Sequence, residues 1–388
     1  MENPTVQDIF HSFYLKYLDR YTPSAEQAKV SHCIMNCKTG AYGANVSVCE
    51  NCGHLQIHYN SCRNRCCPMC QALPTEKWMD AQREDVLEAP YFHVVFTVPQ
   101  ELNPLIYCNQ KLLYDALYHS VSSSINELAE DEKYLGAKVG YICILHTWGS
   151  EMNFHPHIHV ILLGGGLTAK NQWRDKGEEF FFPVKVLSKL FRGKYLDELK
   201  TLWKNKKLHF HGSSEKYRNH YAFKELINIC YEKDWIPHCK KAFNGAQSVI
   251  HYLGKYIHRI AISNRRIIRM DENTVTYYVK DYREAGKWKA LTIPGVEFIR
   301  RFLMHVPPKR FVRIRHYGLL CTRSKTKHLT LCRNLLGCRQ YLSRLKNMET
   351  AQILETLYGI KVSVCKCCGG HLGPPPTTDT FTDLKPNN

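Results

Sequence analysis

Eight of the chain's 18 cysteines lie between Cys33 and Cys70, and this cluster constrains the fold more than any other feature. Two pairs have CxxC spacing, Cys49–Cys52 and Cys67–Cys70, with fourteen residues between the pairs. This spacing is typical of one zinc ion bound by four thiolates, which lets a segment fold around little apolar core. The sequence therefore predicts a structural zinc held by these two pairs.

The other cysteines and histidines of the cluster can supply a second set of ligands. The candidates are Cys33, Cys37, Cys62, Cys66, His54 and His58. Spacing alone leaves open which of them bind metal. A closed set of thiolates has no free coordination position, so the zinc is predicted to be structural rather than catalytic. Arg63 and Arg65 stand inside the cluster, where they can contact DNA phosphates.

Composition limits the class of protein. The formal net charge is +18 over 388 residues, and 44% of the residues are hydrophobic, which is enough for folded cores. A charge of this size favours a polyanionic partner, with nucleic acid first. The polar N-terminus has no secretory signal, and no apolar stretch is long enough to span a bilayer. We therefore expect a cytoplasmic protein without a membrane partner, in which clustered cysteines bind metal.

A second pattern is the histidine run at residues 154–159. His157 and His159 are separated by one apolar residue, so on a strand both imidazoles point to the same face. A hairpin with the preceding predicted strand would bring His146 to them as a third ligand, and Glu151 is the other candidate. Such ligands suit Mn²⁺ or another first-row ion better than Mg²⁺. The ion would bind a phosphate and act as a Lewis acid.

Tyr252 and Tyr256 lie four residues apart in a predicted helix over residues 246–258, and therefore on one face of it. Tyrosine is a poor nucleophile with a pKa of about 10, so it needs help from a metal or from bases such as Lys255 and His258. A metal beside an attacking phenol would cut DNA through a covalent phosphotyrosine. In a chain with 23 tyrosines, ordinary packing of a helix face is the alternative.

The chain divides into three predicted blocks. Residues 1–85 hold the cysteine cluster, and residues 86–265 hold the histidines and tyrosines with a partly helical insertion at 167–245. Residues 266–388 are basic, contain a cysteine knuckle at residues 365–370, and end in a polar tail that is predicted to be disordered. Periodicity and turn residues place the regular elements. Helices are predicted near 9–21, 76–87, 110–128 and 183–191, and strands at 91–99, 139–147 and 157–163.

Several segments, taken in order, resemble the HUH rolling-circle transposases of the insertion sequence 91 family. They are residues 59–71, 96–99, 145–149, 155–159, 252–263, 297–303, 311–318 and 365–370. The resemblance covers nearly the whole chain. The family usually has histidine where this chain has Cys66, whose thiolate can also bind zinc.

The resemblance implies an α+β fold: an HUH endonuclease domain with a central antiparallel ferredoxin-like sheet, a small N-terminal zinc-binding domain and a basic C-terminal region. It implies a transposase that nicks one strand and stays joined to the 5′ phosphate. Tyr252 and Tyr256 would be the nucleophiles, and His157 and His159 would bind the metal with His146. The implied partners are single-stranded DNA at transposon ends, target DNA and a second copy of the chain, in a bacterial cytoplasm at the nucleoid.

The expected cofactors are structural Zn²⁺ and catalytic Mg²⁺ or Mn²⁺. The expected zinc ligands are Cys37, Cys49, Cys52, Cys62, Cys66, Cys67 and Cys70. The expected DNA-binding residues are Arg63, Arg65, Lys255, Arg259, Arg300, Arg301, Arg313 and Arg315, joined by Lys309 and Arg310 in the basic third block.

Three other classes share part of these features. A histidine-triad nucleotide hydrolase has the alternation of His155, His157 and His159, but it needs neither zinc knuckles nor a large positive charge. A relaxase or replication initiator has the same chemistry, and the zinc segment argues against it. A non-catalytic zinc DNA-binding protein gives the tyrosines no role, so a nicking assay on single-stranded DNA separates it from a transposase.

Overall fold

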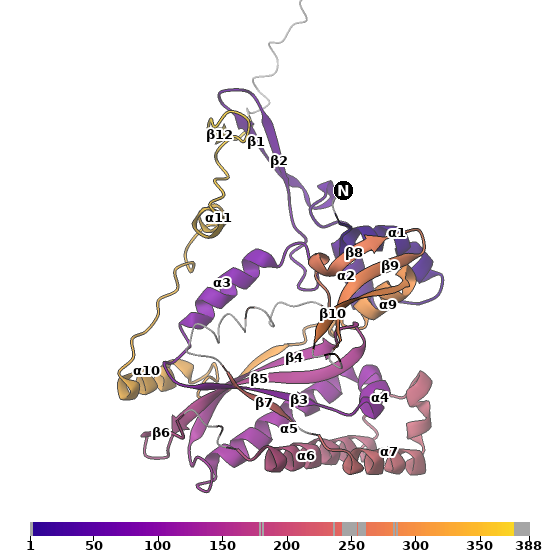
Figure 1. The fold of residues 1–388 in the computed structure, drawn as a ribbon, viewed down its shortest axis with the longest axis vertical. Helices are drawn as coiled ribbons and strands as arrows, with labels where there is room; N and C mark the ends of the chain where they lie inside the picture. Colours follow the sequence, from indigo (N-terminus) through magenta and orange to yellow (C-terminus); the bar gives the residue numbers. More distant parts are fainter. Residues whose placement is uncertain are drawn as a thin grey trace, which may run out of the picture.

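The computed structural model describes residues 3–177, 180, 182–235, 237–242, 254, 261–281, 284 and 286–375. Figure 1 shows their arrangement. The helices are α1 (Val6–Leu18), α2 (Ala25–Met35), α3 (Ala72–Arg83), α4 (Asn103–Cys108), α5 (Gln110–Glu130), α6 (Val184–Lys204), α7 (His220–Glu232), α9 (Gly295–Leu303), α10 (Lys325–Leu336) and α11 (Thr350–Tyr358). The strands are β1 (Ala44–Cys49), β2 (Leu55–Tyr59), β3 (Tyr91–Thr97), β4 (Lys138–Trp148), β5 (Phe154–Leu167), β6 (Trp173–Asp175), β7 (His238–Ala242), β8 (Ile267–Met270), β9 (Thr274–Asp281), β10 (Lys287–Pro294), β11 (Ile314–Gly318) and β12 (Leu372–Gly373).

The largest sheet has the strand order β11-β4-β5-β3-β7, with β6 paired to one end of β5. Every neighbouring pair is antiparallel. Along the chain the elements run β3, α4 and α5, β4, β5, α6 and α7, and β7. The prediction of an α+β fold with a central antiparallel sheet is therefore confirmed, and the predicted hairpin of β4 and β5 lies at the middle of this sheet.

The two faces of this sheet are covered differently. Helices α5, α6 and α7 lie on one side, where Ile158 and Val160 of β5 join the largest apolar core. Side chains alternate along a strand, so Ile161 and Leu163 point to the other face and pack against Leu329 of α10. The odd-numbered positions nearer the start of β5 are histidines rather than aliphatic residues. Because side chains alternate along β5, its even-numbered residues fill the core and these histidines lie on the opposite face of the sheet.

A second sheet, with the order β10-β9-β8, packs with α9 and the N-terminal helices α1 and α2. Phe10 of α1 meets Phe302 of α9 edge to face, with the ring centroids 5.4 Å apart. Gly295 lies so close to Phe13 that a β-carbon there would approach its ring to 2.4 Å. The domain boundaries predicted at residues 85 and 266 stay a prediction. Residues from the first and third predicted blocks pack together in this one core.

Both N-terminal helices begin at capping boxes, which explains why α1 starts earlier than its apolar periodicity predicts. The Thr5 side chain accepts a hydrogen bond from the Asp8 amide at 3.3 Å, and the Asp8 carboxylate accepts one from the Thr5 amide at 2.8 Å. Ser24 and Gln27 repeat this exchange at α2. Each box satisfies amides that the first helical turn leaves without partners.

The C-terminal part of the chain returns to the N-terminal part. Strands β1 and β2 form a hairpin, and β12 pairs antiparallel with β1. Residues 337–364, called the C-terminal strap below, include α11 and run from α10 to β12 past α3 (Figure 1). No helix in the described ranges has the length and apolar character needed to span a membrane. Most of the predicted polar tail, residues 376–388, lies outside the described residues.

Candidate functional site

The histidines of the predicted metal site meet at the middle of the central sheet. His157 and His159 point to the same face of β5, and His146 stands opposite His157 in the register of β4 with β5. The three side chains are buried, with exposed fractions of 3% for His146, 9% for His157 and 7% for His159. Directly paired residues on antiparallel strands have β-carbons about 5 Å apart, so the pairing itself brings the imidazoles together.

The distances in this group suit a single metal ion. One nitrogen from each of His146, His157 and His159 lies within 4.8 Å of the others, and the two Nε2 atoms of His157 and His159 are 3.0 Å apart. Two imidazole nitrogens that are each about 2.1 Å from one ion lie roughly 3.0–3.4 Å apart. The structure thus brings these three predicted residues together, and the donor set fits a first-row divalent ion.

Two neighbours orient the imidazoles. Nδ1 of His157 lies 2.7 Å from the His155 carbonyl oxygen, which can only accept, so Nδ1 carries the hydrogen and Nε2 keeps its lone pair. Nδ1 of His159 lies 2.9 Å from Nε2 of His93 on β3. Burial lowers the pKa of His157 to about 3. The neutral imidazole, which is the form that binds metal, is therefore present at neutral pH.

The other residues near the site have supporting positions. Among the described residues, the group of side chains that lie close enough to share one metal ion includes His146 and not Glu151, which is exposed in the β4–β5 connection. Trp148 stacks on His146 with the ring centroids 4.6 Å apart. His305 reaches the adjacent Thr147 hydroxyl at 3.1 Å, and burial lowers the pKa of His305 to about 4.

Sequence reasoning missed His93 and His305. His93 lies on the predicted strand 91–99, so the sequence could place it on one face of a sheet. Its contact with His159 depends on the pairing of β3 with β5, which the sequence did not predict. His305 follows α9, far from the histidine run, and no spacing in the sequence points to it.

The predicted nucleophiles Tyr252 and Tyr256 lie outside the described residues, as do Lys255, Arg259 and His258. Gly254 is the one described residue between the two tyrosines, and its conformation is helical. A β-carbon on Gly254 would lie 1.7 Å from the sulfur of Met79. At this residue, then, the chain backbone packs directly against α3.

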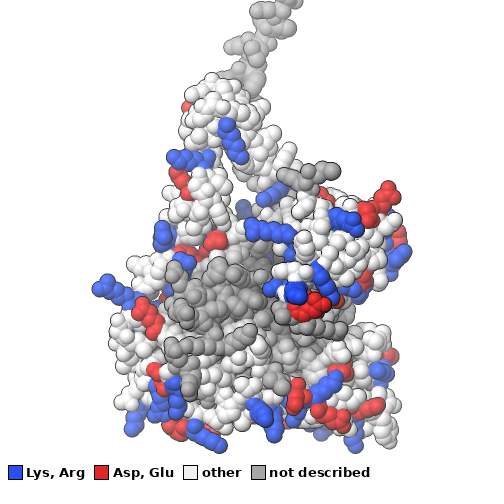
Figure 2. Space-filling view, in the orientation of Figure 1, with Lys and Arg blue, Asp and Glu red and all other residues white. Residues whose placement is uncertain are grey.

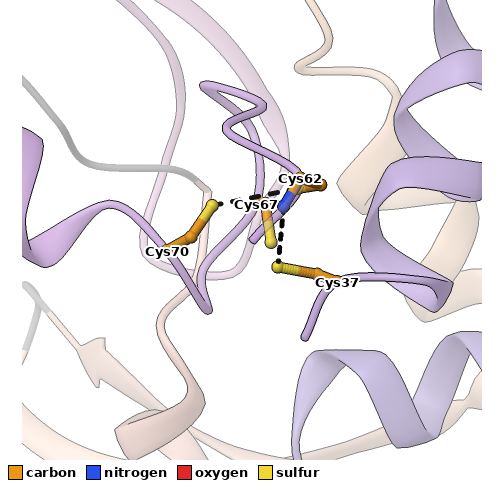
Figure 3. Close-up of side chains that lie close together, drawn as sticks. All are labelled: Cys37, Cys62, Cys67 and Cys70. Carbon is orange, nitrogen blue, oxygen red and sulfur yellow. Dashed lines mark hydrogen bonds between the residues drawn. The ribbon is translucent and has the colours of Figure 1, made fainter. Parts of the chain in front are cut away.

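Four cysteines near the N-terminus form a separate group, called the N-terminal quartet below. It consists of Cys37, Cys62, Cys67 and Cys70, whose sulfur atoms all lie within 4.8 Å of one another. Figure 3 shows the four side chains gathered from two separate stretches of chain. The sulfurs of Cys62 and Cys70 are 3.8 Å apart. Hydrogen bonds from Cys62 and then from Cys67 lower the pKa of the Cys70 thiol, whereas hydrogen bonds with Cys62 and Cys70 raise the pKa of Cys67, so Cys70 is the thiol of this pair that loses its proton first.

This arrangement corrects the expectation that the pairs Cys49–Cys52 and Cys67–Cys70 share one zinc. The β1–β2 hairpin separates the two pairs, and a five-residue strand is about 17 Å long. Cys49 and Cys52 instead meet Cys365 and Cys368 near the C-terminus, which sequence reasoning did not assign as ligands.

The remaining cysteine and histidine candidates lie outside both groups. Among the described residues, neither group of four includes Cys33, Cys66, His54 or His58. Cys66 is buried, and burial raises the pKa of its thiol. The positive charges of Arg313 and Arg65 oppose this effect without cancelling it. Cys66 therefore stays a prediction as a ligand, without support from this geometry.

The predicted DNA-binding arginines fall into two kinds, and Figure 2 shows basic and acidic side chains interspersed on one face of the molecule. Arg63 is exposed. Lys309 and Arg310 are exposed as well. Arg300 and Arg301 instead pair with Glu297, Arg315 pairs with Asp115, and Arg65 donates to the Phe311 carbonyl. Burial lowers the pKa of Arg313.

Two family models match this chain. One, described as "Putative transposase", matches residues 140–328, which include the histidine group. The other, described as "Transposase zinc-binding domain", matches residues 9–98, which include the N-terminal quartet.

Two curated proteins are similar over long stretches. A Sinorhizobium fredii protein named "Putative transposase y4qJ" is 39% identical over 382 residues, covering 97% of this chain and 96% of its own length. The "Transposase for insertion sequence element IS801" of Pseudomonas savastanoi pv. phaseolicola is 28% identical over 299 residues, covering 75% of this chain and 69% of its own length.

Solved structures give only a weak likeness. The conjugative relaxase TrwC in complex with oriT DNA is 14% identical, covering 52% of this chain and 69% of the relaxase chain with a TM-score of 0.26. A score this low supports no inference about fold or function.

Proposed function

The chain belongs to the insertion sequence 91 family of transposases, and from that membership we propose that it nicks and joins single DNA strands at the histidine group. It is a DNA transposase of the rolling-circle type. The observation that carries the proposal is the buried group of His146, His157 and His159 on adjacent strands. A set of three imidazoles leaves coordination positions for phosphate oxygens, as catalytic metal sites do.

The fold supports this assignment. Apart from the short strand β6, which pairs with one end of β5, the elements from β3 to β7 run one strand, helices, two strands, helices and one strand, and the strands are arranged β4-β5-β3-β7. We propose that this core is the ferredoxin-like sheet of an HUH endonuclease. Its central strand β5 would carry the two histidines of that motif.

The protein residues have distinct tasks. A divalent ion bound here would supply Lewis-acid polarisation of the scissile phosphate. The carbonyl of His155 and the ring of His93 orient His157 and His159, whose Nε2 atoms would then hold the ion. Because three imidazole ligands suit Mn²⁺ better than Mg²⁺, we propose Mn²⁺ as the more effective of the two expected ions.

Tyr252 and Tyr256 are the proposed nucleophiles. The phenolic oxygen of one tyrosine forms a bond to phosphorus, the bond from phosphorus to the 3′ oxygen breaks, and the 3′ oxygen leaves as a hydroxyl after taking a proton. The 5′ end then stays on the tyrosine until another 3′ hydroxyl attacks and releases it. Two tyrosines allow one to hold the first end while the other makes the second cut. The proposed partners are single-stranded DNA at the element's ends and target DNA.

A cleavage assay tests the proposal. The full chain is incubated with Mn²⁺ and fluorescent single strands that cover both ends of the element encoding it, and denaturing gels are examined for a covalent adduct. Wild type should form the adduct, whereas His157→Ala and the double variant Tyr252→Phe with Tyr256→Phe should not. The control His119→Ala changes an exposed histidine on α5 and should behave as wild type.

The outcomes of this assay distinguish the proposed nuclease from a DNA-binding protein and test the assigned nucleophiles and metal site separately. A non-catalytic zinc DNA-binding protein would bind the strands and give no adduct with any variant. An adduct that persists in the double tyrosine variant and maps to another tyrosine, such as Tyr278, would refute the assignment of the nucleophiles. Retained cleavage in His157→Ala would refute the metal site.

A further inference from the structure

The second group of four cysteines joins the two ends of the chain. Cys49 and Cys52 belong to the β1–β2 hairpin, whereas Cys365 and Cys368 lie beyond the C-terminal strap. We propose that these four cysteines, called the terminal quartet below, bind a second structural zinc ion that fastens the C-terminus to the N-terminal hairpin. Half of its ligands lie outside residues 9–98, the part that matches the transposase zinc-binding domain.

The sulfur positions suit one tetrahedral ion. The sulfur of Cys49 lies 3.4 Å from that of Cys368, and the sulfur of Cys52 lies 3.8 Å from that of Cys365. All four lie within 4.8 Å of one another. Four thiolates at about 2.3 Å from a tetrahedral zinc are roughly 3.8 Å apart. Thiolate ligands favour zinc over hard ions such as Mg²⁺ and Ca²⁺.

The two halves have the same backbone geometry, although they are distant in sequence. Each reads Cys-x-x-Cys-Gly, and the glycines Gly53 and Gly369 have positive φ angles of 68° and 74°. The Gly53 amide donates to the Cys49 carbonyl at 2.9 Å, and the Gly369 amide donates to the Cys365 carbonyl at 2.9 Å. Two equivalent turns therefore present their cysteines to each other.

Backbone amides also point at the sulfurs of the C-terminal half. The Cys367 amide donates to the sulfur of Cys365, and the Gly370 amide donates to the sulfur of Cys368, each at 3.4 Å. Such hydrogen bonds stabilise the thiolate form that binds metal. Cys367 itself is exposed and lies outside the quartet, which makes it a natural control.

The junction has little apolar core that could hold it without a cross-link. Its buried cluster consists of Cys49, Cys365 and Leu372. On the adjoining strand β2, Leu55 and Ile57 are 59% and 50% exposed. Very small modules usually need a metal or disulfides to fold, because they bury too little apolar surface. Four mutually close sulfurs fit a shared ion, whereas two disulfides would pair them at about 2.05 Å.

The zinc would be one attachment of the C-terminal strap. Others lie at α3 and its C-cap. The Asp80 carboxylate accepts hydrogen bonds from the Tyr341 hydroxyl at 2.6 Å, the Ser343 hydroxyl at 2.5 Å and the Leu345 amide at 2.8 Å, and the Glu84 carboxylate accepts one from the Ser343 amide at 2.9 Å. Between these attachments the strap carries α11 alongside α3. The terminal quartet therefore fixes the strap at the end that Asp80 does not reach.

Zinc counting in the reduced, full-length protein tests the proposal. Elemental analysis after gel filtration should show one zinc fewer per chain in Cys365→Ser/Cys368→Ser than in wild type. Cys49→Ser/Cys52→Ser should lose the same one zinc, and the variant that combines all four changes should lose no more than either pair alone. The matched control Cys367→Ser should keep the wild-type content.

Alkylation of the unmodified protein gives a second measurement that does not depend on folding of variants. Cys49, Cys52, Cys365 and Cys368 should resist iodoacetamide while zinc is bound and become reactive together when a chelator is added. Cys367 should react throughout.

Three results would overturn the proposal. The first is an undiminished zinc content in Cys365→Ser/Cys368→Ser, and the second is a loss of two zinc ions in the combined variant. The third is an intact mass lacking four hydrogens, which would show two disulfides instead. None of these measurements involves DNA cleavage, so their outcome is independent of the proposed nuclease activity.

Discussion

The histidine group and the N-terminal quartet are built by opposite means. The histidines project from the central strand β5 and its neighbour β4, in a sheet whose core includes α5 and α6. Cys62, Cys67 and Cys70 lie in the connection between β2 and α3, which has no helix or strand of its own. We therefore expect the fold to position the histidines whether or not metal is bound, and metal binding to order the second region. The two regions should therefore respond differently to loss of their ligands.

The largest expected effect contrasts Cys67→Ser with His157→Ala. Loss of a zinc thiolate should lower the free energy of unfolding by more than about 4 kcal/mol, since loss of a structural metal is among the most damaging changes. His157→Ala should leave it within about 1 kcal/mol of wild type, while slowing cleavage at least about a hundredfold. Denaturant titration followed by circular dichroism, together with the cleavage assay, measures both.

The control for this pair is Cys66→Ser, which changes a buried cysteine beside the N-terminal quartet that does not belong to it. It should retain zinc and most of its stability. If His157→Ala destabilises the protein as much as Cys67→Ser, the contrast between the two regions is wrong.

A smaller effect is expected at His93, which orients His159 without joining the metal-binding group. His93→Ala should weaken metal binding about 10- to 100-fold, the usual effect of removing a partner of a ligating histidine. A titration of cleavage rate against Mn²⁺ should show a higher half-saturating concentration, and saturating metal should restore most of the rate. A rate that no metal concentration restores would place His93 in the reaction itself.

Much of the central sheet could be predicted from local pattern. The strands of β3, β4 and β5 follow from β-branched and aromatic runs, and alternation puts His157 and His159 on one face. The third ligand could be narrowed only to His146 or Glu151, because the register of a hairpin is fixed by its turn as well as by its strands. The structure places His146 opposite His157 and leaves Glu151 in solvent.

The cysteine pairing could not be predicted from spacing. Two CxxC pairs fourteen residues apart look like partners, yet Cys49 finds Cys368, 319 residues away. The spacing of a CxxC pair indicates that its two cysteines can bind one ion. It does not indicate which distant pair supplies the other two ligands. The arginines show the same limit. Arg315 looks basic in the sequence, and only the fold shows that it pairs with Asp115, 200 residues away.

Asp80 allows a test of whether the strap depends on the metal alone. Burial by itself raises the pKa of Asp80, but hydrogen bonds from Ser343, Tyr341 and Leu345 outweigh burial and lower it below its ordinary value. Asp80→Asn should cost about 1–2 kcal/mol at neutral pH, because its amide group cannot accept all three bonds.

The pH dependence of this difference follows from the sign of the shift. The lowered pKa makes the contribution of Asp80 fully present above the ordinary value of about 4, and it is lost as the pH falls through the lowered value. Denaturant titrations of wild type and Asp80→Asn should therefore converge at low pH. Glu88→Gln, a change at an exposed carboxylate, is the control, and a difference that is constant with pH would contradict this origin.

The smallest expected effect concerns DNA affinity. Arg63 is exposed in the connection that the N-terminal quartet folds, whereas Arg301 is held by Glu297. Arg63→Gln should reduce the slope of log affinity against log salt by about 0.7, the value for one contact with a single strand. Arg301→Gln should change the slope less. Equal effects would show that pairing with Glu297 does not withhold Arg301 from DNA.

Because β1 pairs with β12, the N-terminal hairpin can complete its structure only near the end of translation. Cys52 leaves the ribosome 313 residues before Cys365, its neighbour in the folded protein. At typical bacterial elongation rates this interval is roughly 15–60 s, far longer than a hairpin needs to form. All four cysteines of the N-terminal quartet are available once residue 70 has emerged, so this group can assemble early. Cys49 and Cys52 remain reduced and without Cys365 and Cys368 until almost the whole chain has been made. A chain that ends before residue 365 would lack both the β12 strand and the two C-terminal cysteines that lie against its first hairpin.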